Sequence, residues 1–137
     1  MQDQPSALEL IAAVREYLQN EIVPALDDHR LRFRTLVAAN VLGIVERELP
    51  QEAALLRDEW IRLVALDDPL HPAVPAPTDL EALREDVRAR SATLCERIRA
   101  GEADEGPGRA AVFAHARCCV EEKLRVNNPK YLERVKG

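Results

Sequence analysis

The chain has 137 residues, of which 47% are hydrophobic and 31% charged, and its net charge is −5. That length is close to the commonest size of a single domain, and the hydrophobic share is sufficient for one buried core. The negative charge argues against nucleic-acid binding over the whole surface, because phosphate binding requires clustered Lys and Arg side chains. We therefore expect a single helical domain, residues 1–137, without a nucleic-acid partner.

The cysteines and the N-terminus bear on the cellular compartment. Three cysteines are an odd number, and Cys118 and Cys119 are adjacent and therefore poorly placed to pair with each other. This pattern favours a reducing compartment. No basic segment followed by an apolar run opens the chain, and no apolar segment approaches the ~20 residues of a membrane-spanning helix. We expect a cytoplasmic protein that does not contact a membrane.

Helical periodicity predicts an all-α, single-domain bundle of about five helices. The first helix should start at a Ser6–Glu9 capping box and end or kink at Pro24. Asp27 and Asp28 offer the N-cap of the second helix. The expected ranges of the second to fifth helices are 30–49, 51–66, 80–100 and 109–127, with a capping box at 78–81, closure of the fourth helix at Gly101, and a tail after Pro129. A proline-rich connection, residues 67–79, joins helices three and four.

Apolar side chains at helical spacing predict the faces that build the core. Because aromatic residues make up only 4% of the chain, this core should be mainly aliphatic. The predicted inner faces are Leu56, Trp60, Leu63 and Val64 on the third helix, Leu80, Leu83, Val87, Leu94 and Ile98 on the fourth, and Val112, Phe113, Ala116, Cys119, Val120 and Leu124 on the fifth. The first helix is apolar over about half of its circumference, which suits contact with two or more neighbours.

The second predicted helix places polar residues within an apolar stripe. Phe33, Leu36, Val37, Val41 and Ile44 form the stripe, Asn40 lies near its centre, and Arg47 lies towards its edge. Burying an amide or a guanidinium without partners costs roughly 1–3 kcal/mol or more. Two interpretations follow: the polar groups form a specific internal network, or they face something other than the core of this chain.

The fifth predicted helix repeats this pattern, because Lys123 and Asn127 fall inside its apolar arc. If helices two and five pack together, their polar groups could form one network or line one cleft. In the alternative interpretation, the long cations extend past the edge of the core into solvent and the amides cap nearby carbonyls.

The sequence predicts no metal ion, no cofactor and no catalytic residue. His115 could share an ion with Cys118 and Cys119, but zinc requires three or four ligands and no recognisable spacing supplies the rest. We expect Cys95 and Cys119 to be small buried hydrophobic residues. Most carboxylates, Glu121 and Glu122 among them, are interpreted as solvated or as helix ion-pair partners. The segment GEADEGPG lacks the lysine and the preceding strand of a phosphate-binding loop.

One pattern is enzyme-like. Arg109 and His115 resemble the Arg…His pairing of small helical ribonucleases of the higher-eukaryote-and-prokaryote nucleotide-binding class. A six-residue separation places the two side chains about 120° apart on an ideal helix, which disfavours joint action.

Four segments carry a wider resemblance: QPSALELIAAVREYLQNEIVPAL, RLRFRTLVAANVLGIVEREL, LCERIRAGEAD and VEEKLRVNNPKYLERV. They resemble a family of small bacterial proteins of unknown function that accompany aminoglycoside-phosphotransferase-like kinases and acyl-CoA dehydrogenases in gene clusters. The resemblance covers nearly the whole chain apart from residues 67–78. It transfers no catalytic residue, because that family has none established.

The resemblance implies an accessory role: a non-catalytic helical subunit that binds such a kinase, which acts on hydroxyacyl-CoA intermediates in acid catabolism. Candidate contact residues for a partner or ligand are Arg32, Arg34, Asn40, Arg47, Lys123, Asn127, Asn128 and Tyr131. Tyr131 could instead tuck its ring under the bundle and keep its hydroxyl in water. The alternatives are the ribonuclease and a homo-oligomeric scaffold that binds a small acidic ligand between helices two and five.

Overall fold

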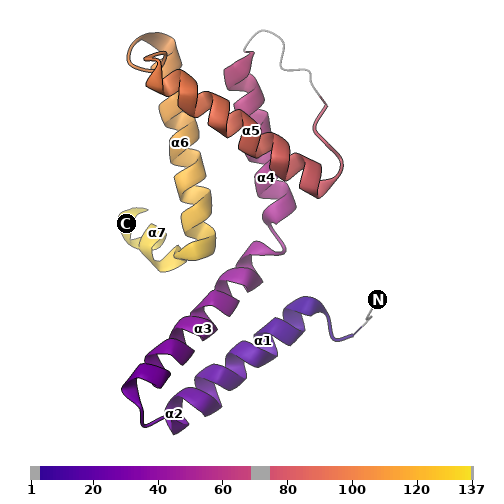
Figure 1. Cartoon of the computed structure of the whole chain (residues 1–137), viewed down its shortest axis with the longest axis vertical. Helices are drawn as coiled ribbons and strands as arrows, with labels where there is room; N and C mark the ends of the chain where they lie inside the picture. Colours follow the sequence, from indigo (N-terminus) through magenta and orange to yellow (C-terminus); the bar gives the residue numbers. More distant parts are fainter. Residues whose placement is uncertain (1–3, 69–74, 137) are drawn as a thin grey trace. The chain divides into compact units, whose positions relative to one another are not determined.

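The structure, a computed structural model, describes residues 4–68 and 75–136, and every regular element in these two ranges is a helix (Figure 1). The elements are α1 (Ala7–Tyr17), the π-helical turn η1 (Leu18–Ile22), α2 (Val23–Ala25), α3 (His29–Glu48), α4 (Glu52–Asp67), α5 (Leu80–Arg99), α6 (Gly106–Asn127) and α7 (Pro129–Lys136). The all-α prediction is therefore confirmed. The central part of the predicted proline-rich connection, residues 69–74, lies outside the described residues.

The chain divides into two compact units, unit 1 (residues 1–51) and unit 2 (residues 52–137). Unit 1 holds α1, η1, α2 and α3, and unit 2 holds α4, α5, α6 and α7. The single domain expected from chain length stays a prediction. Within the described ranges, no helix is both long enough and apolar enough to cross a membrane.

Local sequence signals set the helix ends of unit 1. The N–H of Ser6 donates to Glu9 Oε2 (2.7 Å) and the N–H of Glu9 donates to Ser6 Oγ (3.3 Å), which confirms the capping box. Pro24 has no N–H to donate, and immediately before it the helix widens, so that Val23 donates to the Leu18 carbonyl five residues back. Asp28 then caps α3 by accepting from two backbone N–H groups.

The contact between α1 and α3 is built from small side chains. Ala39 and Gly43 are buried on α3, where they allow close approach of α1. Arg15 of α1 lies beside Gly43, and its Nε donates to Glu46 Oε2 at 2.8 Å. Val23 adds a further buried side chain. The buried core of unit 1 is consequently thin, and much apolar surface of α1 and α3 remains exposed.

The core of unit 2 lies between α4 and α5. Trp60, Leu63 and Val64 of α4 pack with three buried apolar residues of α5. These α5 residues are Leu83, Val87 and Leu94, and Leu56 and Val112 pack against the cluster from its edge. The predicted inner faces of these two helices are confirmed at these positions, although Ile98 is exposed.

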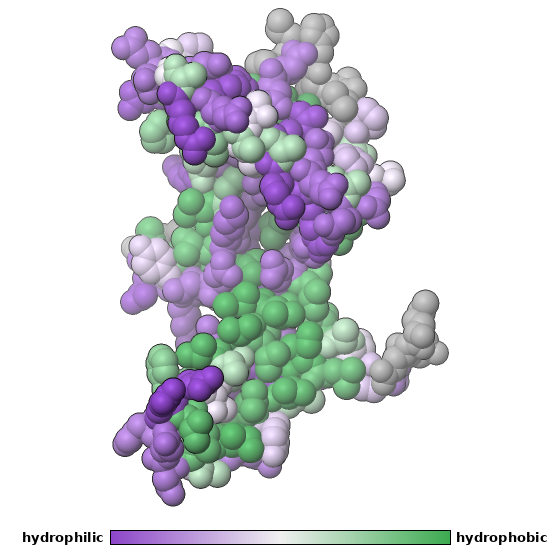
Figure 2. All heavy atoms as spheres, in the orientation of Figure 1, coloured by the Kyte–Doolittle hydropathy of each residue, from purple (hydrophilic) through white to green (hydrophobic). Residues whose placement is uncertain are grey.

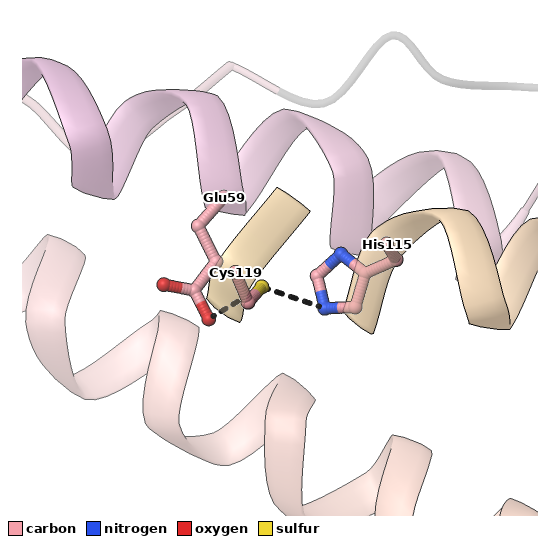
Figure 3. A group of neighbouring side chains, drawn as sticks. All are labelled: Glu59, His115 and Cys119. Carbon is pink, nitrogen blue, oxygen red and sulfur yellow. Dashed lines mark hydrogen bonds between the residues drawn. The ribbon is translucent and has the colours of Figure 1, made fainter. Parts of the chain in front are cut away.

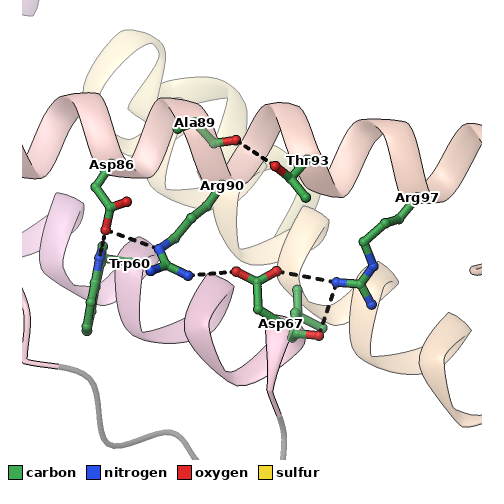
Figure 4. A network of polar contacts seen from close by, with 8 residues as sticks. Trp60, Asp67, Asp86, Ala89, Arg90, Thr93 and Arg97 are labelled. Carbon is green, nitrogen blue, oxygen red and sulfur yellow. Dashed lines mark hydrogen bonds and ion pairs between the residues drawn. The ribbon is translucent and has the colours of Figure 1, made fainter.

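A polar network runs along one side of this core (Figure 4). Trp60 Nε1 donates to Asp86 Oδ2 at 2.6 Å, and this hydrogen bond is the main cause that lowers the pKa of Asp86. Arg90 lies over the Trp60 ring, 5.6 Å from its centroid, and bonds both Asp86 (3.1 Å) and Asp67 (2.7 Å). Arg97 bonds Asp67 from the other side at 3.3 Å. The network therefore ties the C-terminal end of α4 to two turns of α5.

Two helix ends of unit 2 differ from expectation. Asp79, and not Thr78, caps α5, because its carboxylate accepts from the N–H of Ala82 at 2.9 Å. The sequence predicted only a tail after Pro129, but Pro129 begins a further helix, α7, because the first position of a helix needs no N–H donor. Gly101 ends α5 with φ +89°, as predicted from its residue type.

Candidate functional site

The side of α6 that faces the interior of unit 2 is only partly the predicted apolar one, because Val112, Cys119 and Leu124 are half-buried but Phe113, Ala116 and Val120 are exposed. Phe113 and Val120 are 62% and 56% exposed, whereas His115 is 8% exposed and Val126 6%. Cys119 and Glu122 complete the inward face at half-buried positions. The prediction was wrong at Phe113, Ala116 and Val120, because alanines occupy several positions around α6 and apolar spacing alone did not define a face. The inward face carries ionisable groups.

Two of these groups meet a carboxylate of α4 at the contact between α4 and α6 (Figure 3). Glu59 comes from α4, and His115 and Cys119 are one helical turn apart on α6. Cys119 Sγ lies 3.6 Å from Glu59 Oε1 and 3.5 Å from His115 Nε2. All three potential ligand atoms lie within 4.8 Å of one another. The sequence had paired His115 with Cys118 as well, but Cys118 is exposed and is not part of this group.

An ion pair flanks the group. Arg62 of α4 donates to both carboxylate oxygens of Glu122, at 2.9 and 2.5 Å, and its Nη2 lies 4.0 Å from Cys119 Sγ. Both partners are half-buried, with side chains 24% and 16% exposed. Glu122 is thus the partner of an arginine on another helix, and neither solvated nor paired within its own helix, as the sequence had suggested. Sequence spacing could not reveal Glu59 or Arg62, since nothing local links α4 to α6.

The surroundings keep the thiol and the imidazole uncharged near neutral pH. Burial lowers the pKa of His115, and the nearby charge of Arg62 lowers it further. Burial likewise raises the pKa of Cys119, helped by the negative charge of Glu59. A shallow groove of about 260 Å³ is lined in part by Arg62, His115 and Cys118, so it borders the group at His115. The site thus offers a neutral imidazole, a thiol and a carboxylate beside a groove.

His115 should make the stability of unit 2 depend on pH. Because its folded-state pKa lies below the reference value of 6.5, the unfolded chain binds more protons as the pH falls through that value. The free energy of unfolding should therefore decrease between about pH 7 and pH 5.5. Urea unfolding followed by the fluorescence of Trp60, the single tryptophan, measures this in a chelator-containing buffer.

In that experiment, His115→Gln should flatten the pH dependence, because the variant lacks the group that takes up the proton. His29→Gln is the matched control, since His29 is an exposed histidine of unit 1. An unchanged slope in His115→Gln, or an equal flattening in His29→Gln, contradicts the prediction.

In unit 1, the predicted stripe on α3 lies on the surface. Phe33 is 67% exposed, Leu36 46%, Val37 45% and Val41 50%, and Asn40 among them is exposed as well. Figure 2 shows apolar residues gathered over the α1 and α3 helices on the face in view. Asn40 is therefore not buried in the core of its own unit, and the interpretation that it faces a partner or ligand stays a prediction.

The other predicted contact residues have varied surroundings. Arg32 and Arg34 are exposed on α3, Arg47 is half-buried, and Lys123 and Asn127 are exposed on α6. The side chain of Asn128 accepts from the N–H of Tyr131 at the start of α7 (3.2 Å). Tyr131 is 45% exposed, and the guanidinium of Arg134 lies 5.8 Å from its ring centroid. Because Asn40 and Asn127 belong to different units, the ligand site expected between their helices stays a prediction.

The ribonuclease pattern has little geometric support. Arg109 is exposed, stacks on Phe113 at 5.5 Å and donates to the carbonyl of Asp104. His115, in contrast, is buried against Cys119 and Glu59. The expected burial of Cys95 is also wrong, since this thiol is exposed on α5.

These features define an all-helical protein with an exposed apolar helix face in unit 1 and a cluster of potential ligands in unit 2. Residues 24–131 match the model of the family described as domain of unknown function DUF6285, and the chain belongs to that family. No curated protein and no solved structure matches the chain.

Proposed function

We propose that this protein is a non-catalytic accessory subunit of an aminoglycoside-phosphotransferase-like kinase that acts on hydroxyacyl-CoA intermediates in acid catabolism. The partner is inferred from the sequence resemblance, because the proteins of the resembled family are encoded beside kinases of this type. The family match to a domain of unknown function is compatible with this role. The proposal includes a bacterial origin and a cytoplasmic location.

The exposed stripe of α3 is the observation that carries the proposal. Phe33, Leu36, Val37 and Val41 lie along two turns of one helix and are each 45% or more exposed. Contiguous apolar surface of this kind is uncommon on monomeric proteins and is typical of binding surfaces. Burial of such a stripe by a partner is favourable by about 25 cal/mol per Å² of apolar surface removed from water.

Polar residues in and around the stripe suit a protein partner. Arg32 and Arg34 extend from the N-terminal half of α3, and arginine is enriched in protein interfaces because it combines charge with a flat contact surface. Asn40 supplies a hydrogen-bonding group inside the apolar area and can specify the register of the contact. A complementary kinase surface would present an apolar groove with acidic residues beside it.

Matched phenylalanine variants test this role. The chain has two phenylalanines, Phe33 in unit 1 and Phe113 in unit 2, with similar exposed fractions of 67% and 62%. Phe33→Ser should weaken binding to the kinase encoded beside this protein by about 30-fold, the equivalent of a 2 kcal/mol hot spot. Phe113→Ser should leave the affinity within about threefold. Titration calorimetry with the purified kinase measures both constants.

Three results would overturn the proposal. The unaltered protein could fail to bind the kinase, or both phenylalanine variants could lose affinity equally. Light scattering of the protein alone could also reveal a dimer that Phe33→Ser dissociates, in which case a second copy and not the kinase covers the stripe.

A further inference from the structure

The cluster at the contact between α4 and α6 has the chemistry of a metal site. From the geometry of Glu59, His115 and Cys119 we propose that these residues bind one divalent transition-metal ion of the zinc type. The inference is independent of the kinase-binding role, because it concerns unit 2 and needs no partner.

The distances match those between ligands of a tetrahedral zinc ion. Zinc–sulfur bonds of about 2.3 Å and zinc–nitrogen or zinc–oxygen bonds of about 2.0–2.1 Å place the sulfur about 3.6 Å from each other ligand atom. Cys119 Sγ lies 3.5 Å from His115 Nε2 and 3.6 Å from Glu59 Oε1. The third edge, between Nε2 and the carboxylate, is within 4.8 Å and can close by rotation of the Glu59 side chain.

The helices hold the ligands in place before an ion arrives. His115 and Cys119 are four residues apart on α6, which places both side chains on one face. Glu59 approaches from α4, a helix anchored by the buried Trp60 and Leu63. Two ligands one turn apart and a third from a packed neighbouring helix are a rigid arrangement that limits the ordering cost of binding.

The identity and charge of the groups select the ion. One imidazole nitrogen, one thiolate sulfur and one carboxylate oxygen form a set that suits Zn²⁺, whereas Mg²⁺ and Ca²⁺ prefer oxygen ligands alone. On binding, the S–H bond of Cys119 breaks, its proton passes to solvent, and the sulfur lone pair joins the ion. Thiolate and carboxylate then balance the 2+ charge, while Glu122 balances Arg62.

The burial of His115 is otherwise poorly compensated. The residue is 8% exposed, its Nε2 has only the sulfur of Cys119 at 3.5 Å, and its Nδ1 is buried without a hydrogen-bond partner among the described residues. Buried polar groups in native structures are nearly always paired, and an unpaired one calls for an explanation. An ion bound at Nε2 would replace the weak contact of that atom with sulfur by a strong one, although Nδ1 would keep its surroundings.

An ion can reach the ligands from solvent. Glu59 and Cys119 are only half-buried, and His115 lines a groove of about 260 Å³. Water can occupy the fourth coordination position. Three protein ligands and one water are the usual arrangement of a zinc site that remains open on one side.

Titration of the metal-free full-length protein with Zn²⁺ and Co²⁺ tests the assignment. We expect one ion per chain, a higher melting temperature with Zn²⁺, and sulfur-to-cobalt charge-transfer absorption with Co²⁺. Cys119→Ser should remove that absorption, whereas Cys118→Ser, at the exposed adjacent cysteine, should keep it. His115→Gln and Glu59→Gln should each weaken Zn²⁺ binding by at least about 100-fold, since even residues behind the ligands commonly contribute 10–100-fold.

Trp60 fluorescence and circular dichroism establish that each variant is folded. If a variant at His115 or Cys119 unfolds, Glu59→Gln tests the site instead, because this nearly isosteric change is at a half-buried position. The proposal is overturned if the unaltered protein does not bind Zn²⁺ at micromolar concentration. It is equally overturned if Cys118→Ser loses the cobalt absorption while Cys119→Ser retains it, or if folded Glu59→Gln binds as tightly as the unaltered protein.

Discussion

Replacing Leu63 with alanine is expected to lower the free energy of unfolding of unit 2 by about 3–5 kcal/mol. Leu63 is 1% exposed and is one of the largest fully buried side chains of the described residues. It packs in the cluster with Trp60 of its own helix and Leu83 of α5. Truncation removes apolar contacts and leaves a cavity that two packed helices can only partly close, which puts the cost in the upper part of the usual range.

Ile61→Ala is the matched control for Leu63→Ala. Ile61 lies two residues earlier on the same helix and is 58% exposed, so its truncation should change the free energy of unfolding by less than about 1 kcal/mol. Urea unfolding with Trp60 fluorescence reports both values, because the single tryptophan belongs to this cluster. Equal losses for the two variants would show that α4 does not pack on the face described here.

Glu122→Gln is expected to destabilise unit 2 by about 1–3 kcal/mol, because Arg62 loses a charged bidentate partner in a partly buried position. The side chains of Arg62 and Glu122 are 24% and 16% exposed. Water and salt therefore screen this ion pair less than a pair at the surface and more than a fully buried pair. A glutamine keeps the shape and one acceptor oxygen, so the loss reports mainly on charge.

The control for Glu122→Gln is Glu85→Gln, which removes the same charge at an exposed position of α5. Its effect should be below about 0.5 kcal/mol, as for most exposed charges. Measurements in low and high salt add a second criterion. The decrease in the free energy of unfolding caused by Glu122→Gln should become only slightly smaller at high salt. A loss that salt abolishes would contradict a partly buried pair.

Sequence reasoning succeeded where the information was local. The capping box at Ser6, the cap at Asp28 and the stop at Gly101 each depend on a few neighbouring residues, and each is present in the structure. The inner faces of α4 and α5 were also predictable, because leucine, valine and tryptophan recur there at helical spacing. Helical periodicity and residue type were sufficient to predict these helix ends and inner faces.

Sequence reasoning failed where a distant partner decides the outcome. The inward face of α6 carries His115, Cys119 and Glu122. Their polar groups are compensated by Arg62 and Glu59, which belong to a helix about 60 residues earlier in the chain. For α3, an apolar stripe was visible, but no local pattern indicates that Ala39 and Gly43, and not Phe33, face α1. Which residues of α3 contact α1 depends on how the two helices pack, and neither helix sequence alone reveals it.

Asp67 of α4 is hydrogen-bonded to two arginines of α5, Arg90 and Arg97, and these two bonds help to fix the alignment of the two helices. Sliding α5 along α4 by one turn, about 5.4 Å, would bring Asp79, Leu83 and Arg90 into the places of the buried Leu83, Val87 and Leu94. It would also bring Asp86 and Thr93, four residues earlier on α5, into the places of the two arginines. Carboxylate would then oppose carboxylate. Ion pairing and apolar burial thus penalise the same misaligned pairing of α4 and α5.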